Sequence, residues 1–249
     1  MSETNLQDLC ELGQTQLMET QYLAAIATLS LAERVAWDTG DFDTLARLYF
    51  PLQEARRQKR QLAGEGVVQL NLLANGPGDR AVDADGIVGR IPHGQLLVAG
   101  WGTVEPAVQV RRLALERNLY LECFLAAVYP ISGGERAIVV APLAETPLPE
   151  PTERSIDALL ALVPSYCIVW PTAVLPNGPM QGDTETFAHT MAVWESLHAM
   201  HLAAADSTPD PVRRMEAYRR VLEIDDACEL AHQNLAMTAR EVDRGRRAS

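Results

Sequence analysis

The chain has 249 residues, of which 47% are hydrophobic and 22% are charged, so it is long enough to bury the core of one or two domains. It has no run of about 18 apolar residues, and its start, MSETNLQDLCEL, lacks the basic and apolar stretches of a secretory signal, so we expect a soluble, cytoplasmic protein with no membrane partner. A formal net charge of -12 argues against a nucleic-acid partner, because phosphate binding needs a concentrated basic surface.

Hydrophobic periodicity divides the chain into three parts. The period is helical from about residue 5 to 63 and again from about 184 to 243, whereas the stretch between alternates strand-like and helical runs. We therefore expect an α+β protein, with helical hairpins in residues 1–63 and 184–249 that flank a small mixed-sheet α/β domain in residues 64–183.

The first part predicts a helical hairpin followed by a third helix. Leu9, Leu12 and Gly13 lie on one apolar stripe, and Thr20 can cap the second helix. A third helix starts after Gly40. Pro51 should kink that helix unless it breaks there.

The middle part predicts a small mixed sheet. In chain order we expect a strand at 67–73, a polar loop to Gly94, a strand at 95–99, a helix through 108–115 and a strand at 119–129. Strand, helix and strand at this spacing indicate a parallel right-handed crossover. A turn at 132–135 predicts that the strand at 137–141 pairs antiparallel with the preceding one. A helix at 156–162, a strand at 166–170 and an exit linker at 171–183 complete this part.

The two helical ends share a pattern of small and large residues that is typical of stacked helix pairs, and Gly13 leaves room for a partner helix because it has no side chain. In this spacing both ends resemble the tetratricopeptide repeat. The resemblance implies helix-packing roles for ten residues: Leu12, Gly13, Ala25, Leu29, Ala32, Trp194, Leu197, Tyr218, Leu235 and Ala236.

Each end alone is shorter than the three or so stacked repeats that such folds need to bury a continuous core. Three arrangements remain open. The two ends pack together with the α/β domain inserted, or each end caps that domain, or a second subunit completes the stack in a homo-oligomer.

Clusters of possible metal ligands do not match known spacings. His198 and His201 lie one turn apart, but there is no HExxH motif, and the repeat pattern places both at packing positions. Asp79, Asp83 and Asp85 do not fit the spacing of a calcium loop, so we expect a solvated turn. We predict no metal site.

The turn from Gly100 to Thr103 follows a strand and precedes a helix, which is where α/β folds bind phosphate. Glu105 in the first helical turn would repel an anion, and Thr103 as a helix cap with Pro106 just inside the helix explains the segment without a ligand. We therefore predict no cofactor.

The four cysteines have no CxxC spacing, which argues against a thiolate zinc site and a disulfide framework, and we expect them to be small buried residues. Pairing of a cysteine or Ser132 with His93 stays open, but we assign no catalytic residue. The cysteines are Cys10, Cys123, Cys167 and Cys228.

The leading hypothesis for function is a non-enzymatic scaffold or adaptor that binds a protein or peptide on its helix pairs. Acidic residues expected to be exposed at 223–229, among them Asp225 and Asp226, would favour a basic partner. The alternative is an enzyme with a ligand pocket near Gly100–Pro106, in which Asp83, Asp85, His93 and Glu105 would gather around one concave site.

Overall fold

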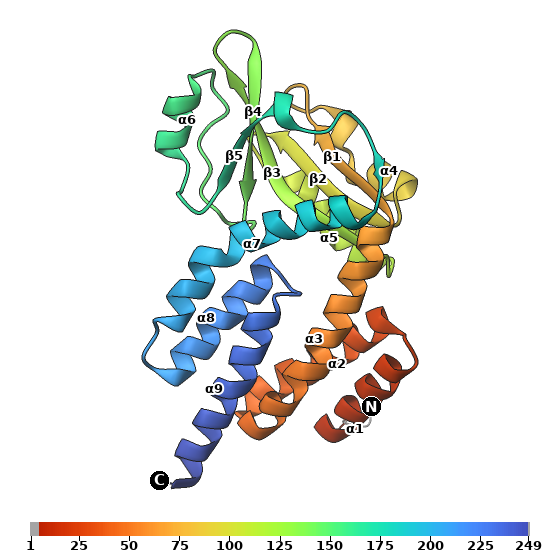
Figure 1. Cartoon of the computed structure of the whole chain (residues 1–249), viewed down its shortest axis with the longest axis vertical. Helices are drawn as coiled ribbons and strands as arrows, with labels where there is room; N and C mark the ends of the chain where they lie inside the picture. The colour runs from red at the N-terminus through yellow and green to blue at the C-terminus, as the bar shows by residue number, and fades with distance from the viewer. Residues whose placement is uncertain (1–4, 249) are drawn as a thin grey trace. The chain divides into compact units, whose positions relative to one another are not determined.

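The computed structural model describes residues 5–248 and shows an α+β fold with helices at both ends of the chain and a sheet in the middle (Figure 1). The chain divides into two compact units. The helical unit combines the residues up to Arg60 with those from His198 onward, and the sheet unit is residues 61–197. Residues 1–4 of the segment used to judge a secretory signal lie outside the described part.

Six helices contribute to the helical unit, and two of them, α3 and α7, continue into the sheet unit. Their bounds are Leu6–Met18 for α1, Tyr22–Thr39 for α2, Phe42–Glu65 for α3, Thr184–Asp206 for α7, Pro211–Ile224 for α8 and Glu229–Ala248 for α9. None of the helices in residues 5–248 combines the length and the hydropathy needed to cross a lipid bilayer.

Helices from both ends of the chain share a core in the helical unit. Ala36, Leu45 and Tyr49 from the N-terminal helices pack in one buried cluster with Tyr218 and Leu235 from the C-terminal helices. A second cluster joins α1, α2 and α3 through residues that include Leu9, Leu29 and Leu52. Of the three arrangements that the sequence left open, the structure therefore has the one in which the two ends pack together.

Close packing of α1 on α2 depends on Gly13. A methyl group at this position would lie 2.6 Å from Cγ and Cδ2 of Leu29, a side chain that is fully buried. Ala25 and Ala32 of the same helix face are also fully buried. Leu12, by contrast, is 49% exposed, so its expected place in the packing is wrong.

One local expectation for these helices, the cap of α2, is also wrong. Thr20 has a φ of 60° and does not cap α2, whose cap is Gln21 without a side-chain hydrogen bond. Pro51 lies inside α3, which runs on through it to Glu65 without a break. A proline removes one backbone donor, but packing against both cores holds the helix together around that gap.

The sheet unit contains a mixed sheet of six strands in the order β5-β4-β3-β2-β1-β6. Strands β1, β2 and β3 are parallel, whereas β4, β5 and β6 each pair antiparallel with their neighbours. The bounds are Val67–Leu73 for β1, Gly94–Trp101 for β2, Leu121–Ile131 for β3, Glu135–Ala141 for β4, Ile168–Pro171 for β5 and Met180–Gln181 for β6.

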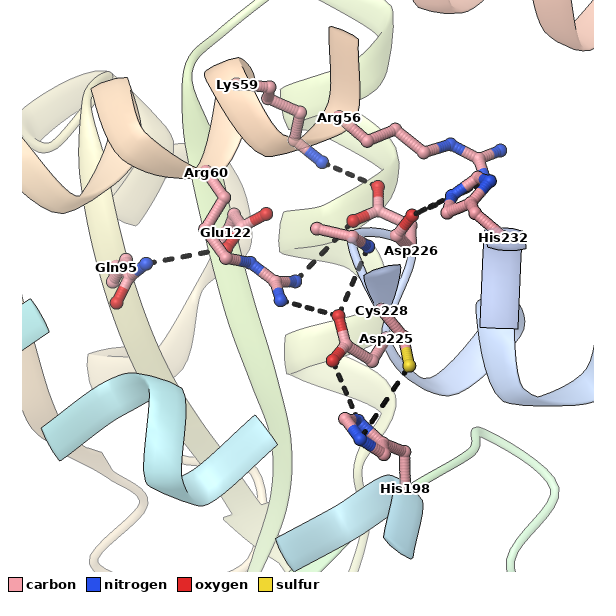
Figure 2. A network of polar contacts seen from close by, with 11 residues as sticks. Arg56, Lys59, Arg60, Gln95, Glu122, His198, Asp225, Asp226, Cys228 and His232 are labelled. Atoms are coloured by element: carbon pink, nitrogen blue, oxygen red, sulfur yellow. Dashed lines mark hydrogen bonds and ion pairs between the residues drawn. The ribbon is translucent and has the colours of Figure 1, made fainter. Parts of the chain in front are cut away.

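The parallel crossover and the hairpin predicted from the sequence are both present. Helix α5, Glu105–Glu116, connects β2 to the parallel strand β3, and β3 turns into the antiparallel β4. Helix α6, Ile156–Leu162, precedes β5 as expected. On β2 and β3 the side chains of Gln95 and Glu122 form a buried pair, with Nε2 of Gln95 donating to Oε2 of Glu122 at 3.5 Å (Figure 2).

Two segments that were expected to be irregular contain regular structure. Helix α4, Ala84–Arg90, lies in the predicted polar loop between β1 and β2, and its cap is Asp83, which accepts a hydrogen bond from the backbone of Gly86 at 2.8 Å. The predicted exit linker contains a short 3-10 turn, η2, at Thr172–Val174 and then β6, which adds to the sheet beside β1.

The N-terminal part of α7 belongs to the sheet unit. The ring of Trp194 packs against Phe124 of β3 with 4.3 Å between centroids, and the guanidinium of Arg111 from α5 lies over the same indole. Trp194 and Leu197 are buried, but both fall in residues 61–197, outside the helical unit in which the repeat pattern placed them.

Candidate functional site

A network of charged side chains lies within the helical unit (Figure 2). Its centre is Asp225, at the end of α8, whose side chain is 1% exposed. Asp225 accepts a hydrogen bond from Nη1 of Arg60 at 2.5 Å and contacts Nδ1 of His198 at 2.8 Å. Arg60 belongs to α3 and His198 to α7, so one carboxylate ties together helices from both ends of the chain.

Asp226 makes a second set of contacts with the same helix α3. Nζ of Lys59 lies 2.8 Å from its carboxylate, and its backbone carbonyl accepts a hydrogen bond from Nε2 of His232 at 3.0 Å. The guanidinium of Arg56 also donates to that carbonyl, at 3.4 Å. A carbonyl oxygen cannot donate, so Nε2 of His232 carries a proton.

The surroundings shift the pKa values of these groups in opposite directions. Burial disfavours the charged form of His198, but hydrogen bonds to Asp225 and Cys228 outweigh it and raise the pKa from 6.5 to about 9. Burial and then the charge of Arg56 lower the pKa of His232 to about 3. Burial would raise the pKa of Asp225, yet Arg60 and His198 prevail and lower it. At neutral pH we expect a charged His198 and a neutral His232.

His198, Asp225 and Cys228 each offer a ligand atom within 4.8 Å of the others, which is the separation expected around a metal ion. The two contacts of His198 point to different ring nitrogens, since Asp225 lies at Nδ1 and the thiol of Cys228 lies 3.7 Å from Nε2. The carboxylate of Asp225 is also already neutralised by Arg60. This geometry suits a structural ion-pair network better than a shared metal ion.

A groove lies elsewhere on the helical unit, along α1 and α3. Its volume is about 550 Å³, and its lining includes the exposed side chains of Gln7, Glu11 and Gln14 from α1. The α3 side contributes Arg47, which forms an ion pair with Asp43 at 3.1 Å, and Leu48. The rest of the lining is Asn5, Leu6, Cys10, Leu29, Asp41, Thr44 and Pro51.

The groove combines acids, amides and a few apolar carbons. Glu11 and Asp41 give it two carboxylates, and the charge of Arg47 is compensated by Asp43. Among the residues that the structure describes, the side-chain amide of Gln14 has no hydrogen-bond partner. Amides beside a hydrophobic floor can hydrogen-bond the main chain of an extended peptide while apolar side chains pack below it.

The acidic side chains considered for calcium are separately engaged. Asp79 accepts hydrogen bonds from the backbone amides of Asn75 and Ala81, Asp83 caps α4, and Asp85 forms an ion pair with Arg117. Backbone donors lower the pKa of Asp79. These carboxylates therefore serve loop and helix geometry.

The four residues of the alternative enzyme hypothesis do not gather in one place. His93 directly precedes β2 and contacts the backbone oxygen of Leu62. Glu105 follows the other end of that strand and accepts a hydrogen bond from Gln109. At about 3.3 Å per residue, the eight residues of β2 keep these two ends roughly 26 Å apart.

Packing also fills the turn from Gly100 to Pro106. A methyl group at Gly102 would lie 2.6 Å from the ring of Pro151, and one at Gly100 would lie 2.7 Å from the backbone oxygen of Thr103. The cap of α5 is Val104, so the expected cap at Thr103 is wrong, although the hydroxyl of Thr103 accepts a hydrogen bond from the amide of Glu105 at 3.2 Å.

The cysteines differ in burial, and all four are free thiols. Cys123 and Cys228 are buried, as expected, and burial raises the pKa of Cys123 to about 12. Cys10 and Cys167 are only partly buried, which differs from the expectation for these two.

Sequence reasoning missed the network because it treated its members separately. His198 was assigned to helix packing, and Asp225 was expected on an exposed acidic face, which is wrong because its residue is 1% exposed. One signal was available: two consecutive acids end an amphipathic helix, and the basic run at 56–60 has no acid within it. Charges of opposite sign on two amphipathic helices are expected to pair with each other where they are buried.

Comparison of the chain with models of protein families, with curated proteins and with solved structures finds no match.

Proposed function

We propose that the chain is a non-enzymatic adaptor of the cytoplasm whose helical unit, built from tetratricopeptide-like helix pairs, binds an extended segment of a protein partner in the groove along α1 and α3. The observation that carries the proposal is the groove itself, with its amide side chains, its apolar floor and its volume of about 550 Å³. Stacked repeats of this kind form extended concave surfaces that bind other proteins.

The charge of the groove supports a basic partner. The groove lining contains two carboxylates, Glu11 and Asp41, and one cation, Arg47. Arg47 is already paired with Asp43, so the two carboxylates keep their negative charge. The whole chain carries a net charge of -12, which steers basic ligands toward it and repels acidic ones.

A binding assay with defined peptides tests the proposal on the full chain. Extended 12-residue peptides of basic, neutral and acidic composition would be compared by fluorescence anisotropy at moderate salt. We expect basic peptides to bind, and Glu11→Arg to weaken them by about tenfold, because the new cation repels them inside the groove. Glu19→Arg is the matched control, since Glu19 is the exposed C-terminal cap of α1 and does not line the groove.

Cys10 provides a second, local readout. Its thiol lines the groove and is half-buried, so a bound peptide should slow its alkylation by iodoacetamide, while Cys167 in the sheet unit should react at an unchanged rate. Equal peptide affinity of the Glu11→Arg and Glu19→Arg variants, together with unprotected Cys10, would contradict the proposal.

A further inference from the structure

The sheet unit has a hollow of its own, about 450 Å³ in volume, at the end of β1. Figure 1 shows that the segment between β5 and β6 crosses the sheet from one edge to the other, and residues 172–177 of this segment form one wall of the hollow. Arg136, at the start of β4, lines another side. Volumes of this size suit a small metabolite.

The β1 side of the hollow is polar. Asn71 and Leu73 of this strand both line the hollow. Nε2 of Gln69 donates to Oδ1 of Asn71 at 3.2 Å, which leaves the amide nitrogen of Asn71 as a donor toward the hollow. Thr172 and Asn177 add further hydrogen-bonding side chains from the opposite wall.

Arg136 is held in place by neutral oxygens. Its Nη1 donates to the backbone oxygen of Ala74 at 3.4 Å and to Oδ1 of Asn75 at 3.1 Å. Asp79 fixes Asn75 in turn, by accepting from its backbone amide at 2.7 Å and from its side-chain amide at 2.9 Å. Within residues 5–248, no carboxylate lies within ion-pair distance of Arg136, so the charge of a guanidinium that lines a hollow is uncompensated there.

We propose that this hollow binds a small organic carboxylate with a single negative charge, whose carboxylate group pairs with Arg136 and whose other polar groups bond to Asn71, Thr172 and Asn177. A guanidinium presents parallel N–H donors that match the planar carboxylate group. The amides and the hydroxyl can both donate and accept, so they suit hydroxyl substituents on the ligand.

The charge of the sheet unit favours one negative charge on the ligand over two. Residues 61–197 contain seven arginines, no lysine and fifteen carboxylates, which leaves an excess of eight negative charges. Asp79 lies within two hydrogen bonds of Arg136. A phosphate dianion would meet more repulsion than a carboxylate in this environment.

The test uses the full chain with methyl labels on leucine, followed by NMR during titration with glycerate, lactate, propionate and inorganic phosphate. Leu73 and Leu175 line the hollow and report on its occupation. We expect glycerate to shift both methyl signals in the millimolar range and to bind more tightly than propionate, which lacks hydroxyl groups. Arg136→Gln should weaken glycerate by about tenfold or more, because a neutral amide replaces the cation.

Two further variants separate binding from folding. Arg90→Gln is the matched control, since Arg90 is an exposed arginine of the same unit that does not line the hollow, and it should bind like the unchanged chain. Asn177→Ala removes an exposed side chain of the hollow and should weaken glycerate without disturbing the core. The proposal is overturned if no carboxylate shifts the two leucines at about 10 mM, if Arg136→Gln binds as the unchanged chain does, or if phosphate binds more tightly than glycerate.

Discussion

At the scale of single residues, Asp225 is the centre of the charge network in the helical unit. It faces Arg60 and His198, and the amide of Ala227 also donates to it at 3.2 Å. Replacement by asparagine keeps the shape but removes the acidic partner of His198, and it leaves Arg60 with only the carboxylate of Asp226, at 3.5 Å. We expect Asp225→Asn to lower the free energy of unfolding by about 3–5 kcal/mol in urea titrations.

Glu241→Gln is the control for that measurement. Glu241 forms an ion pair with Arg214, but its side chain is 53% exposed, so the loss should stay below about 1 kcal/mol. If the two variants lose similar free energy of unfolding, the buried Asp225 network contributes no more to stability than an exposed ion pair.

The two histidines of the network predict a maximum in the stability of the chain against pH. The folded pKa of His198 is raised from 6.5 to about 9, so its stabilisation is complete below pH 6.5 and is lost as the pH rises through 9. The folded pKa of His232 is lowered to about 3, so its contribution is complete above pH 6.5 and is lost toward acid. The lowered pKa of Asp225 adds to the acid loss.

Thermal unfolding between pH 4 and 10 checks this prediction. We expect greatest stability near pH 6.5 and a loss on the alkaline side of about 2 kcal/mol, smaller than the full pKa shift implies because solvent screens part of the interaction. His198→Gln should flatten the alkaline side and leave the acid side in place. If His198→Gln loses stability toward alkaline pH as steeply as the unchanged chain does, a group other than His198 causes that loss.

At the scale of helices, Gly13 tests how closely α1 and α2 approach. Alanine is favoured over glycine in a helix by about 1 kcal/mol. In Gly13→Ala, however, the new methyl group would meet Leu29 at 2.6 Å in a closed core, and overpacking costs about 1–3 kcal/mol. We therefore expect Gly13→Ala to have a lower free energy of unfolding than the unchanged chain, as measured by chemical denaturation. In Gly245→Ala in α9, the added methyl group would meet no atom of residues 5–248 within 4 Å beyond its own chain neighbours and local helix backbone, so the change should be neutral or stabilising.

The elements that the sequence predicted well are those with long or repeated patterns. Strand β1 and helix α6 have the expected bounds, and the crossover through α5 follows from the strand spacing. Helix α4 was missed because it has only seven residues, two of them glycines, which the composition of a loop also explains. Strand β6 was missed because two residues show no periodicity, and only pairing with β1 defines it.

The candidate sites depend on contacts between residues far apart in the sequence, which is why little of them could be predicted. Arg60 and Asp225 are separated by 165 positions, and Arg136 and Asn75 by 61. Periodicity assigns each residue to a face of its own element but does not say which elements meet. The spacing did identify Gly13, Ala25 and Leu29 as close-packed, because that contact lies within one hairpin.

At the scale of the whole molecule, the helical unit requires both ends of the chain. Residues 5–60 bring Phe42, Leu45 and Tyr49 to a core whose other half comes from α8 and α9. A fragment of residues 1–60 would expose this face to water, since the partner residues lie beyond position 197. Exposed apolar area of this kind prevents a short helical segment from folding cooperatively.

Fragment complementation tests this dependence. We expect residues 1–60 and residues 198–249, each expressed alone, to show weak helicity and no cooperative melting by circular dichroism, and an equimolar mixture to gain both. The charge network should contribute, because Lys59 and Arg60 lie on the first fragment and Asp225 and Asp226 on the second. The mixture should therefore melt at a lower temperature when the second fragment carries Asp225→Asn, whereas Glu241→Gln should leave the melting temperature nearly unchanged. Cooperative melting of residues 1–60 alone would mean that the N-terminal helices form a domain without the C-terminal half of their core.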